Sequence, residues 1–432
     1  MTSFPRKAAV LALTCWAAAA AGTAGLAAEP PSLRKGPLPM ETSCVVCHRE
    51  LDGAALEPVT RAADDVHFQK GLACHDCHGG DPEAGMDGDP SAAHDEARGW
   101  KGKPSRLQVP ELCGRCHADP AFMKRFDPQE RTDQLAEYRT SGHGRRNAAG
   151  DAQAAVCVDC HGVHGVRPVT DPRSGVHPSR VAQTCARCHS DASLMAPYGL
   201  PTRQHEQYQA SVHARALYEG GDTSAPTCND CHGSHGAVPP GVSSVANVCG
   251  SCHTREATLF REIEARKGMD LEACIQCLIC HSNHEVKPPT PEMLGVGEGS
   301  TCTGCHAEGD AGWAGAATMA EGLGRLRRRL AEASEQLDAA EHAGMEVGPD
   351  RFALQTASDQ LVEARVLVHS FDIERFSKAA AEGIAAADEG VAAAGRAFRE
   401  LRSRRNGLAL SLVVIAAVMV SLILTIRRIE RR

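Results

Sequence analysis

The chain has 432 residues and a mildly acidic net charge of −8, and only 4% of its residues are aromatic. No isoleucine occurs before Ile263, so the first part of the chain lacks the side chains that build an ordinary hydrophobic core. The charge balance argues against a nucleic-acid partner, which would need a basic surface, while 20 cysteines and 21 histidines indicate another source of core.

Residues 1–28 have the pattern of a secretory signal peptide. Arg6 and Lys7 give a charged start, a short apolar run follows, and small residues precede a polar stretch. An uncleaved N-terminal anchor is the alternative, but the apolar run is short for a membrane span. We therefore expect a cleaved signal and an exported chain, in which Cys15 has no role.

Residues 29–311 carry nine copies of the pattern Cys-x-x-Cys-His. Two thiols at this spacing bond the two vinyl groups of one haem, and the adjacent histidine ligates its iron. The cysteine pairs are Cys44/Cys47, Cys74/Cys77, Cys113/Cys116, Cys157/Cys160, Cys185/Cys188, Cys228/Cys231, Cys249/Cys252, Cys277/Cys280 and Cys302/Cys305. The proximal histidines that follow them are His48, His78, His117, His161, His189, His232, His253, His281 and His306. The sequence thus predicts nine covalently bound haem c groups.

Zinc sites and disulfides are the alternative interpretations of paired cysteines. Zinc ribbons do not require a histidine after every pair, and a disulfide framework needs no histidine at all. Nine repeats in an exported chain favour haem, because covalent haem attachment occurs outside the cytoplasm. Cys274 precedes Cys277 by three residues, but Leu278 follows Cys277, so we interpret Cys274 as a spare thiol rather than part of a tenth motif.

Twelve histidines remain to supply second axial ligands, and two contexts recur among them. His164, His235 and His284 each follow a proximal histidine by three residues, which places them to ligate a neighbouring haem rather than their own. His143 and His213 share the context Tyr-x-x-Ser-x-His. The predicted distal ligands are His67, His94, His143, His164, His205, His213, His235 and His284. Bis-histidine ligation gives low potentials and closes the iron to substrates.

The other histidines are weaker candidates. His75 and His177 are spare ligands. His342 and His369 lie in the segment after the haem motifs, where we expect structural roles, although His369 stays a candidate to cap the last haem. For each predicted ligand, the alternative is a solvated surface histidine.

The motif-bearing region is thinly built and internally repeated. It holds about 31 residues per motif, too few to insulate neighbouring haems. Residues 138–189 and 208–253 share one order of motifs, residues 277–306 keep its two haem motifs, and residues 74–117 are a looser copy. We expect a leading haem at Cys44 and then four two-haem units, made of short helices and long irregular connections.

Residues 312–406 differ in composition, with alanine, leucine, arginine and glutamate in place of much of the glycine and proline. Apolar residues between 319 and 340 recur in alternating steps of four and three, as in a packed helix. Residues 344–350 break the pattern, and two more helices follow, the last starting near Ile373. We expect a structural helical bundle rather than a catalytic domain.

Residues 407–426 are predicted to form a transmembrane helix, and residues 427–432 a cytoplasmic tail. The span has no charged residue from Leu408 to Ile426 and is long enough to cross a hydrocarbon core. Arginines flank both ends, so the predicted signal peptide, rather than charge bias, orients it. The overall prediction is a mainly α-helical protein with much irregular structure: a haem-packed multihaem cytochrome domain, an α-helical bundle and one C-terminal transmembrane helix.

On these motifs the chain resembles the multihaem c-type cytochromes of anaerobic respiration. The units Cys-x-x-Cys-His-Gly-x-His-Gly, which begin at Cys157 and Cys228, look like those of class III-like and NapC/NrfH-like cytochromes. The long helices after the motifs are similar to those of the octahaem hydroxylamine oxidoreductase group. The resemblance implies bis-histidine haems of low potential. The chain departs from the NapC/NrfH type in its C-terminal anchor and its number of motifs, and it has no Cys-x-x-Cys-Lys.

These observations predict a periplasmic cytochrome, anchored in the inner membrane, that passes single electrons in an anaerobic-type respiratory chain. Its expected partners are redox proteins, either a quinol-oxidising membrane complex or periplasmic cytochromes and reductases, and no nucleic acid. The alternative is an oxidoreductase that acts on nitrite, hydroxylamine or a sulfur oxyanion at one open haem. An electron carrier is favoured over a catalyst, and no catalytic residue is assigned.

Overall fold

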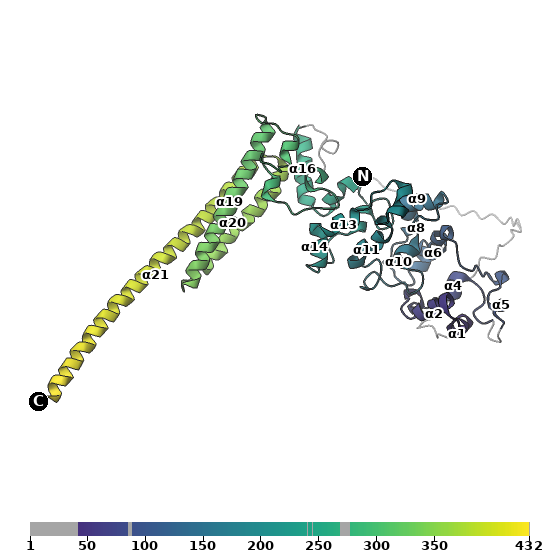
Figure 1. The fold of residues 1–432 in the computed structure, drawn as a ribbon, viewed down its shortest axis with the longest axis horizontal. Helices are drawn as coiled ribbons and strands as arrows, with labels where there is room; N and C mark the ends of the chain where they lie inside the picture. The colour runs from purple at the N-terminus through teal and green to yellow at the C-terminus, as the bar shows by residue number, and fades with distance from the viewer. Residues whose placement is uncertain (1–41, 85–88, 240, 244, 268–276, 432) are drawn as a thin grey trace, which may run out of the picture. The chain divides into compact units, whose positions relative to one another are not determined.

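The computed structural model describes residues 42–84, 89–239, 241–243, 245–267 and 277–431 as helices joined by irregular segments (Figure 1). No β-strand occurs in these ranges. The predicted fold class, mainly helical with much irregular structure, is confirmed. The predicted signal peptide, with Cys15, and Cys274 lie outside the described residues.

Contacts divide the chain into one unit that ends at Lys103 and a second that begins at Pro104. The first unit consists of short helices: α1 (Ser43–Arg49), η1 (Gly53–Ala55), α2 (Glu57–Ala62), α3 (Val66–Gln69), α4 (Cys74–His78), α5 (Pro90–Ala93) and η2 (Glu96–Arg98). The domain limits predicted from composition stay predictions.

The second unit begins with many short helices. They are η3 (Arg106–Gln108), α6 (Val109–His117), α7 (Pro120–Met123), α8 (Gln134–Thr140), α9 (Gly142–Ala148), α10 (Cys157–His161), α11 (Pro178–His189), α12 (Ala192–Met195), η4 (Ala196–Tyr198), α13 (Gln204–Gln209), α14 (Val212–Tyr218), α15 (Cys228–His232), η5 (Val245–Ser251), α16 (Thr254–Lys267), α18 (Cys277–His281), η6 (Pro291–Met293) and η7 (Cys302–Gly304). Three long helices follow them.

Three motif helices, α4, α10 and α15, are five residues long because their own sequence delimits them. Each has an aspartate at its third position that accepts a hydrogen bond from the backbone N–H before the helix, at 2.7 Å in each case. These aspartates are Asp76, Asp159 and Asp230. A glycine with φ between 72° and 84° then ends each helix directly after the proximal histidine. In these three motifs, the haem-attachment pattern therefore contains the residues that start and end its own helix.

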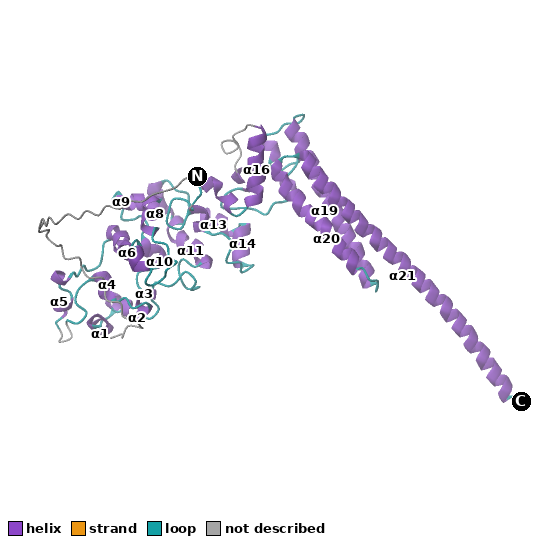
Figure 2. Ribbon diagram, turned by 180° about the vertical axis from the view of Figure 1, so that it is seen from behind, coloured by secondary structure: helices purple, strands orange, loops and turns teal. Residues whose placement is uncertain are grey.

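The three long helices α19 (Ala311–His342), α20 (Gly348–Leu367) and α21 (Ile373–Glu430) pack side by side (Figures 1 and 2), and η8 (Val368–Ser370) joins the last two. Their contact faces consist mostly of small residues, which let the helix backbones approach. The fully buried positions include Ala333, Ala357, Ala387 and Ala394, with Leu326, Leu337 and Phe376 filling the space between them. A Cβ atom at Gly383 would lie 2.9 Å from both methyl groups of Leu326.

α21 is a continuous helix of 58 residues, about 87 Å long at 1.5 Å per residue. Its first part packs in the bundle, whereas the apolar side chains from Leu408 onward are exposed. Among the described residues, α21 is the helix that is long and apolar enough to cross a membrane.

Replacing the buried Phe376 by alanine should lower the free energy of unfolding of the bundle by about 3–5 kcal/mol, because the side chain is 1% exposed and leaves a cavity. Phe352→Ala is the matched control, since Phe352 is 84% exposed. Urea unfolding followed by helical circular dichroism in detergent measures both. Equal effects of the two substitutions would contradict the packing described for α19, α20 and α21.

Candidate haem sites

All nine motifs lie in the described ranges, and each lies on, or begins or ends in, a short helix. Cysteines three residues apart on a helix share one face, so each motif presents two thiols together. The 18 motif cysteines are partly or largely exposed, and none is disulfide-bonded. Each motif thus offers an accessible pair of thiols beside a histidine.

The second cysteine is the more exposed of the two in five of the nine motifs. The exposed second cysteines are Cys47, Cys77, Cys160, Cys252 and Cys305, and the half-buried ones are Cys116, Cys188, Cys231 and Cys280. The first cysteines are half-buried, except Cys277, which is exposed. The sulfur atoms of both positions are therefore within reach of a haem vinyl group that approaches from outside the helix. The assignment of each of these cysteines to a thioether bond stays a prediction.

Five proximal histidines face a second histidine ring at a nearly constant distance. The pairs and the distances between ring centres are His48/His94 (6.1 Å), His189/His143 (5.9 Å), His161/His235 (6.1 Å), His232/His284 (5.9 Å) and His281/His369 (6.2 Å). Two imidazoles that bond one metal ion from opposite sides, at roughly 2 Å each, have ring centres about 6 Å apart. The side chains therefore fit an iron between each pair.

His213 lies near the proximal histidine His253, close enough for a charge interaction between the two side chains. Burial lowers the pKa of His213, and the charge on His253 lowers it further. Partial burial also lowers the pKa of His189, His235 and His284. A lowered pKa favours the neutral imidazole, which is the form that binds a metal.

Hydrogen bonds at Nδ1 orient several of the rings. His48 Nδ1 lies 2.9 Å from the carbonyl oxygen of Ala55, and His78 Nδ1 lies 2.9 Å from that of Gly102. Because a carbonyl oxygen only accepts hydrogen bonds, Nδ1 carries the proton and Nε2 keeps its lone pair. This is the arrangement by which proteins orient histidine ligands of metals.

Three of the pairs are nearly parallel and link alternate motifs. The ring planes differ by 5° for His161/His235 and by 14° for His232/His284. His235 follows the sixth motif but faces the fourth, and His284 follows the eighth motif but faces the sixth. The third parallel pair, at 22°, is formed by His369. Each of these contacts ties two distant parts of the second unit together.

The context Tyr-x-x-Ser-x-His has a structural explanation. The Tyr138 hydroxyl donates to the carbonyl oxygen of Ala155 at 2.9 Å, two residues before Cys157, and Ser141 Oγ accepts from Gly144 N–H and so caps α9. The second copy repeats this: Tyr208 bonds Pro226, and Ser211 caps α14. The tyrosine therefore fixes α8 or α13 against the next motif, while the serine starts the helix that carries the histidine.

Three predicted distal ligands have other surroundings. His67 lies on α3, with Nδ1 3.0 Å from Asp65 Oδ1, and His164 is partly buried after α10. His205 lies on α13 with its Nε2 3.2 Å from the side-chain nitrogen of Gln209. His369, which the sequence left between a structural role and capping the last haem, faces His281, the proximal histidine of the eighth motif. The ligand set as a whole stays a prediction.

Thiols of successive motifs lie next to each other. Hydrogen bonds join the first cysteines of four motif pairs: Cys44/Cys74, Cys113/Cys157, Cys185/Cys228 and Cys249/Cys277. Longer-range charge interactions, which do not require contact, link three of the intervening neighbours: Cys160/Cys185, Cys231/Cys252 and Cys280/Cys302. From the third motif to the ninth, each motif therefore has a cysteine near one of the next motif in sequence order.

This spatial grouping differs from the sequence repeat. The repeat groups the second motif with the third, and so on, and leaves the motif at Cys44 alone. The hydrogen-bonded thiols instead group the first motif with the second, through Cys44 and Cys74, and leave the motif at Cys302 at the end. The sequence repeat and the hydrogen-bonded thiols thus pair the nine motifs differently: the repeat leaves the first motif unpaired, and the thiols leave the ninth unpaired.

Asp159, inside the fourth motif, connects it to both neighbouring motifs. Arg106, just before α6, donates to both carboxylate oxygens of Asp159, at 3.0 and 2.7 Å. Arg187, inside the fifth motif, donates to the backbone carbonyl oxygen of Asp159. The bidentate ion pair with Asp159 raises the pKa of Arg106.

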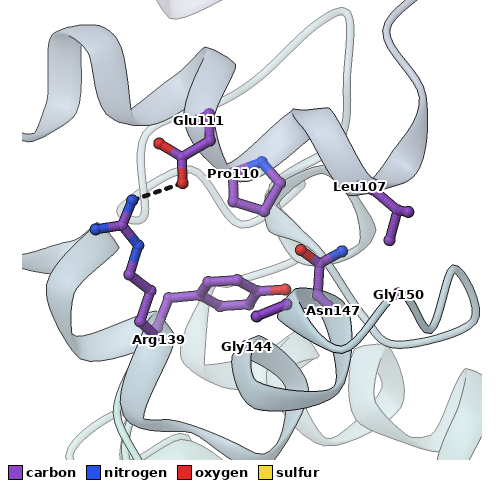
Figure 3. Close-up of a pocket in the computed structure, with 9 residues that line it drawn as sticks. Leu107, Pro110, Glu111, Arg139, Gly144, Asn147 and Gly150 are labelled. Atoms are coloured by element: carbon purple, nitrogen blue, oxygen red, sulfur yellow. Dashed lines mark hydrogen bonds and ion pairs between the residues drawn. The ribbon is translucent and has the colours of Figure 1, made fainter.

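A pocket beside α6 contains no motif residue. Pro110 and Glu111 line one side, Tyr138 and Arg139 another, and Arg139 Nη2 bonds Glu111 Oε1 at 2.6 Å (Figure 3). Asn147 closes it from α9. It offers no pair of thiols and no histidine, so it is not a haem-attachment site.

The alternative interpretations fit less well than haem. No group of three or more histidine, cysteine, aspartate or glutamate residues suited to a metal ion occurs in the part of the chain that the structure describes. The two large hydrophobic clusters lie mainly in the bundle, and the motif region has one small cluster, of Ala182, Tyr208 and Ala214. A region with so little core needs bulky apolar groups between its helices.

Among curated proteins, the C-type polyheme cytochrome OmcC of Geobacter sulfurreducens is 26% identical to this chain over 203 residues. The match covers 46% of this chain and 20% of OmcC, so the chain spans about a fifth of that relative's length. No family model matches the sequence, and no solved structure matches the chain. The chain is therefore a distant homologue of a polyhaem c-type cytochrome.

His235→Ala should convert one haem from low-spin to high-spin, because it removes the imidazole that faces His161. His205→Ala is the control, since the Nε2 atom of His205 is engaged with Gln209 and should leave the spectrum unchanged. Electron paramagnetic resonance of the oxidised proteins measures the high-spin fraction. A high-spin signal in the His205 variant and none in the His235 variant would reverse these ligand assignments.

Proposed function

We propose that this chain is a membrane-anchored cytochrome that binds nine haem c groups and passes single electrons along them. The observation that supports this best is the series of neighbouring cysteines from Cys113 to Cys302, in which hydrogen bonds alternate with longer-range charge interactions. Each cysteine sulfur is expected to form a thioether bond to a haem, so haems bonded to neighbouring sulfur atoms must lie close together. Haem, when bound, supplies a one-electron couple at each motif.

The paired histidines determine what these sites do. A second imidazole on the face opposite the proximal histidine keeps solvent and small substrates away from the metal. Two histidines also favour a lower potential than a histidine and a methionine would. Backbone carbonyl groups, such as those of Ala55 and Gly102, hold the rings in one orientation. These properties suit electron transfer without bond making or breaking.

The location follows from the two ends of the sequence. The proposed signal peptide sends the motif region across the inner membrane, and α21 is long and apolar enough to hold it there. The haem region then faces the periplasm, where its partners would be quinol-oxidising membrane complexes, soluble cytochromes or reductases of an anaerobic-type respiratory chain.

Full-length protein in detergent should contain nine haems per chain by the pyridine haemochrome assay and take up nine electrons at negative potentials in a redox titration. Replacing Cys302 and Cys305 by alanine should remove one haem and leave eight that are still reduced. Cys274→Ala is the matched control, and it should keep nine. Fewer haems in the Cys274 variant, or fewer than nine in the unaltered chain, would contradict the proposal.

A second function is favoured by one observation at the ninth motif. No histidine ring pairs with His306 in the described part of the chain, which includes all 21 histidines. His306 is 46% exposed, and its Nδ1 lies 3.2 Å from Asp310 Oδ1. The carboxylate makes the imidazole a stronger ligand. An iron held by His306 alone would be open, as an oxidoreductase for nitrite, hydroxylamine or a sulfur oxyanion requires.

If the ninth haem is open, the oxidised protein should give a high-spin signal equal to one haem per chain that changes when nitrite or hydroxylamine is added. Asp310→Asn should raise the potential of that haem, because an amide is a weaker acceptor for the imidazole N–H than a carboxylate. Magnetic resonance and redox titration measure the two effects. Nine low-spin haems and no turnover would exclude this second function.

A further inference from the structure

The turn η8, between two helices of the bundle, carries a histidine that faces the eighth motif. We infer that His369 is the second axial ligand of the haem held by Cys277, Cys280 and His281. The inference rests on the proposed function, because it requires haem at this motif. It assigns a metal-binding role to a residue of the bundle, which otherwise contributes only packing and membrane anchoring.

The geometry matches that of the other parallel pairs. The ring centres of His281 and His369 are 6.2 Å apart, and their planes differ by 22°. The Nδ1 atom of His369 lies 3.0 Å from the carbonyl oxygen of Val366, which fixes the proton on Nδ1 and leaves Nε2 for a metal. A solvated surface histidine would have no reason to adopt this combination of distance, angle and proton position.

The register of the motifs explains why the ligand comes from so far along the chain. The fourth and sixth motifs face His235 and His284, which lie three residues after the proximal histidines of the sixth and eighth motifs. The eighth motif has no such motif two places further on. Even the ninth has Gly309 in the position three residues after its proximal histidine. His369 therefore takes the position, opposite the proximal histidine of the eighth motif, that a histidine of a later motif takes in the fourth and sixth.

The turn that carries His369 is firmly held. Ser370 is fully buried, and its hydroxyl donates to the carbonyl oxygen of Leu367 at 2.7 Å. Phe371 adopts φ +45°, a conformation that non-glycine residues rarely take, and Asp372 then caps α21. A turn fixed in this way positions an adjacent ligand without requiring the iron to order it.

Helix α16 holds the turn from the side of the haem motifs. Leu259 packs in the buried cluster that includes Leu367 and Phe376. Arg375 Nη1 donates to Glu262 Oε2 at 2.8 Å. The helix that follows the seventh motif therefore packs on the ends of α20 and α21 that flank His369. This packing fixes the position of His369 relative to the motif region.

The decisive experiment replaces His369 by glycine in the full-length protein and adds free imidazole. One haem in nine should become high-spin and bind carbon monoxide in its reduced form, while the haem count stays at nine. Imidazole should restore the low-spin state, because the vacated space admits it. His342→Gly is the matched control: His342 is exposed at the other end of α19, about 45 Å along that helix from the ninth motif, and its loss should leave all spectra unchanged.

A second variant separates ligation from folding. His369→Met keeps a side chain that ligates iron, so it should leave the haem low-spin and raise its potential relative to the bis-histidine form. Unchanged spin state and potential in both His369 variants, with nine haems present, would overturn the inference and leave the proposed function intact. A chain that binds no haem would overturn the proposed function itself.

Discussion

The distance between two imidazole rings is the constraint that the rest of this molecule depends on. An iron ion accepts two opposed nitrogens only if the ring centres lie about 6 Å apart, and five described pairs lie between 5.9 and 6.2 Å. Side-chain packing alone gives no reason for such a narrow range, because ring contacts without a metal occur over wider distances. The short helices of the motif region are sufficient for this purpose, because each carries only one or two of these histidines.

Local interactions meet this constraint where hydrophobic packing is scarce. An aspartate and a glycine delimit each of the motif helices α4, α10 and α15, and a tyrosine and a serine position the helices that carry His143 and His213. Arg106 and Asp159 add an ion pair between neighbouring motifs. The bundle is instead stabilised by hydrophobic packing: small residues and the buried Leu326, Leu337 and Phe376 hold its three long helices together. One chain thus combines a region organised around bound groups with a region organised around its own side chains.

Features that depend on residues close together in the sequence could be predicted from it. Contacts between residues far apart in the sequence, which depend on how the helices pack, could not. Spacing alone identified the nine motifs, and the apolar steps between residues 319 and 340 identified the packed face of α19. The sequence left His369 as a candidate to cap the last haem, but its contact with His281 of the eighth motif could not be predicted, because that contact arises from α16 packing on the turn beside His369. The repeat also suggested that the Cys44 motif stands apart, whereas Cys44 and Cys74 share a hydrogen bond. The order of repeated motifs in a sequence therefore does not determine which of the motifs are in contact in the structure.

The direction in which the parallel pairs run has a consequence for biosynthesis. In each of these pairs the second histidine comes later in the chain than the first, so a chain exported from its N-terminus, as proposed above, would present His161 well before His235. A haem attached at the fourth motif would wait, open and reactive, until the sixth motif has crossed the membrane. The eighth would wait longest, until the bundle has been completed around His369. If His369 is the second ligand of the eighth haem, a chain cut short before that turn would keep one iron without its second ligand, and only a chain with the complete bundle would have that site closed.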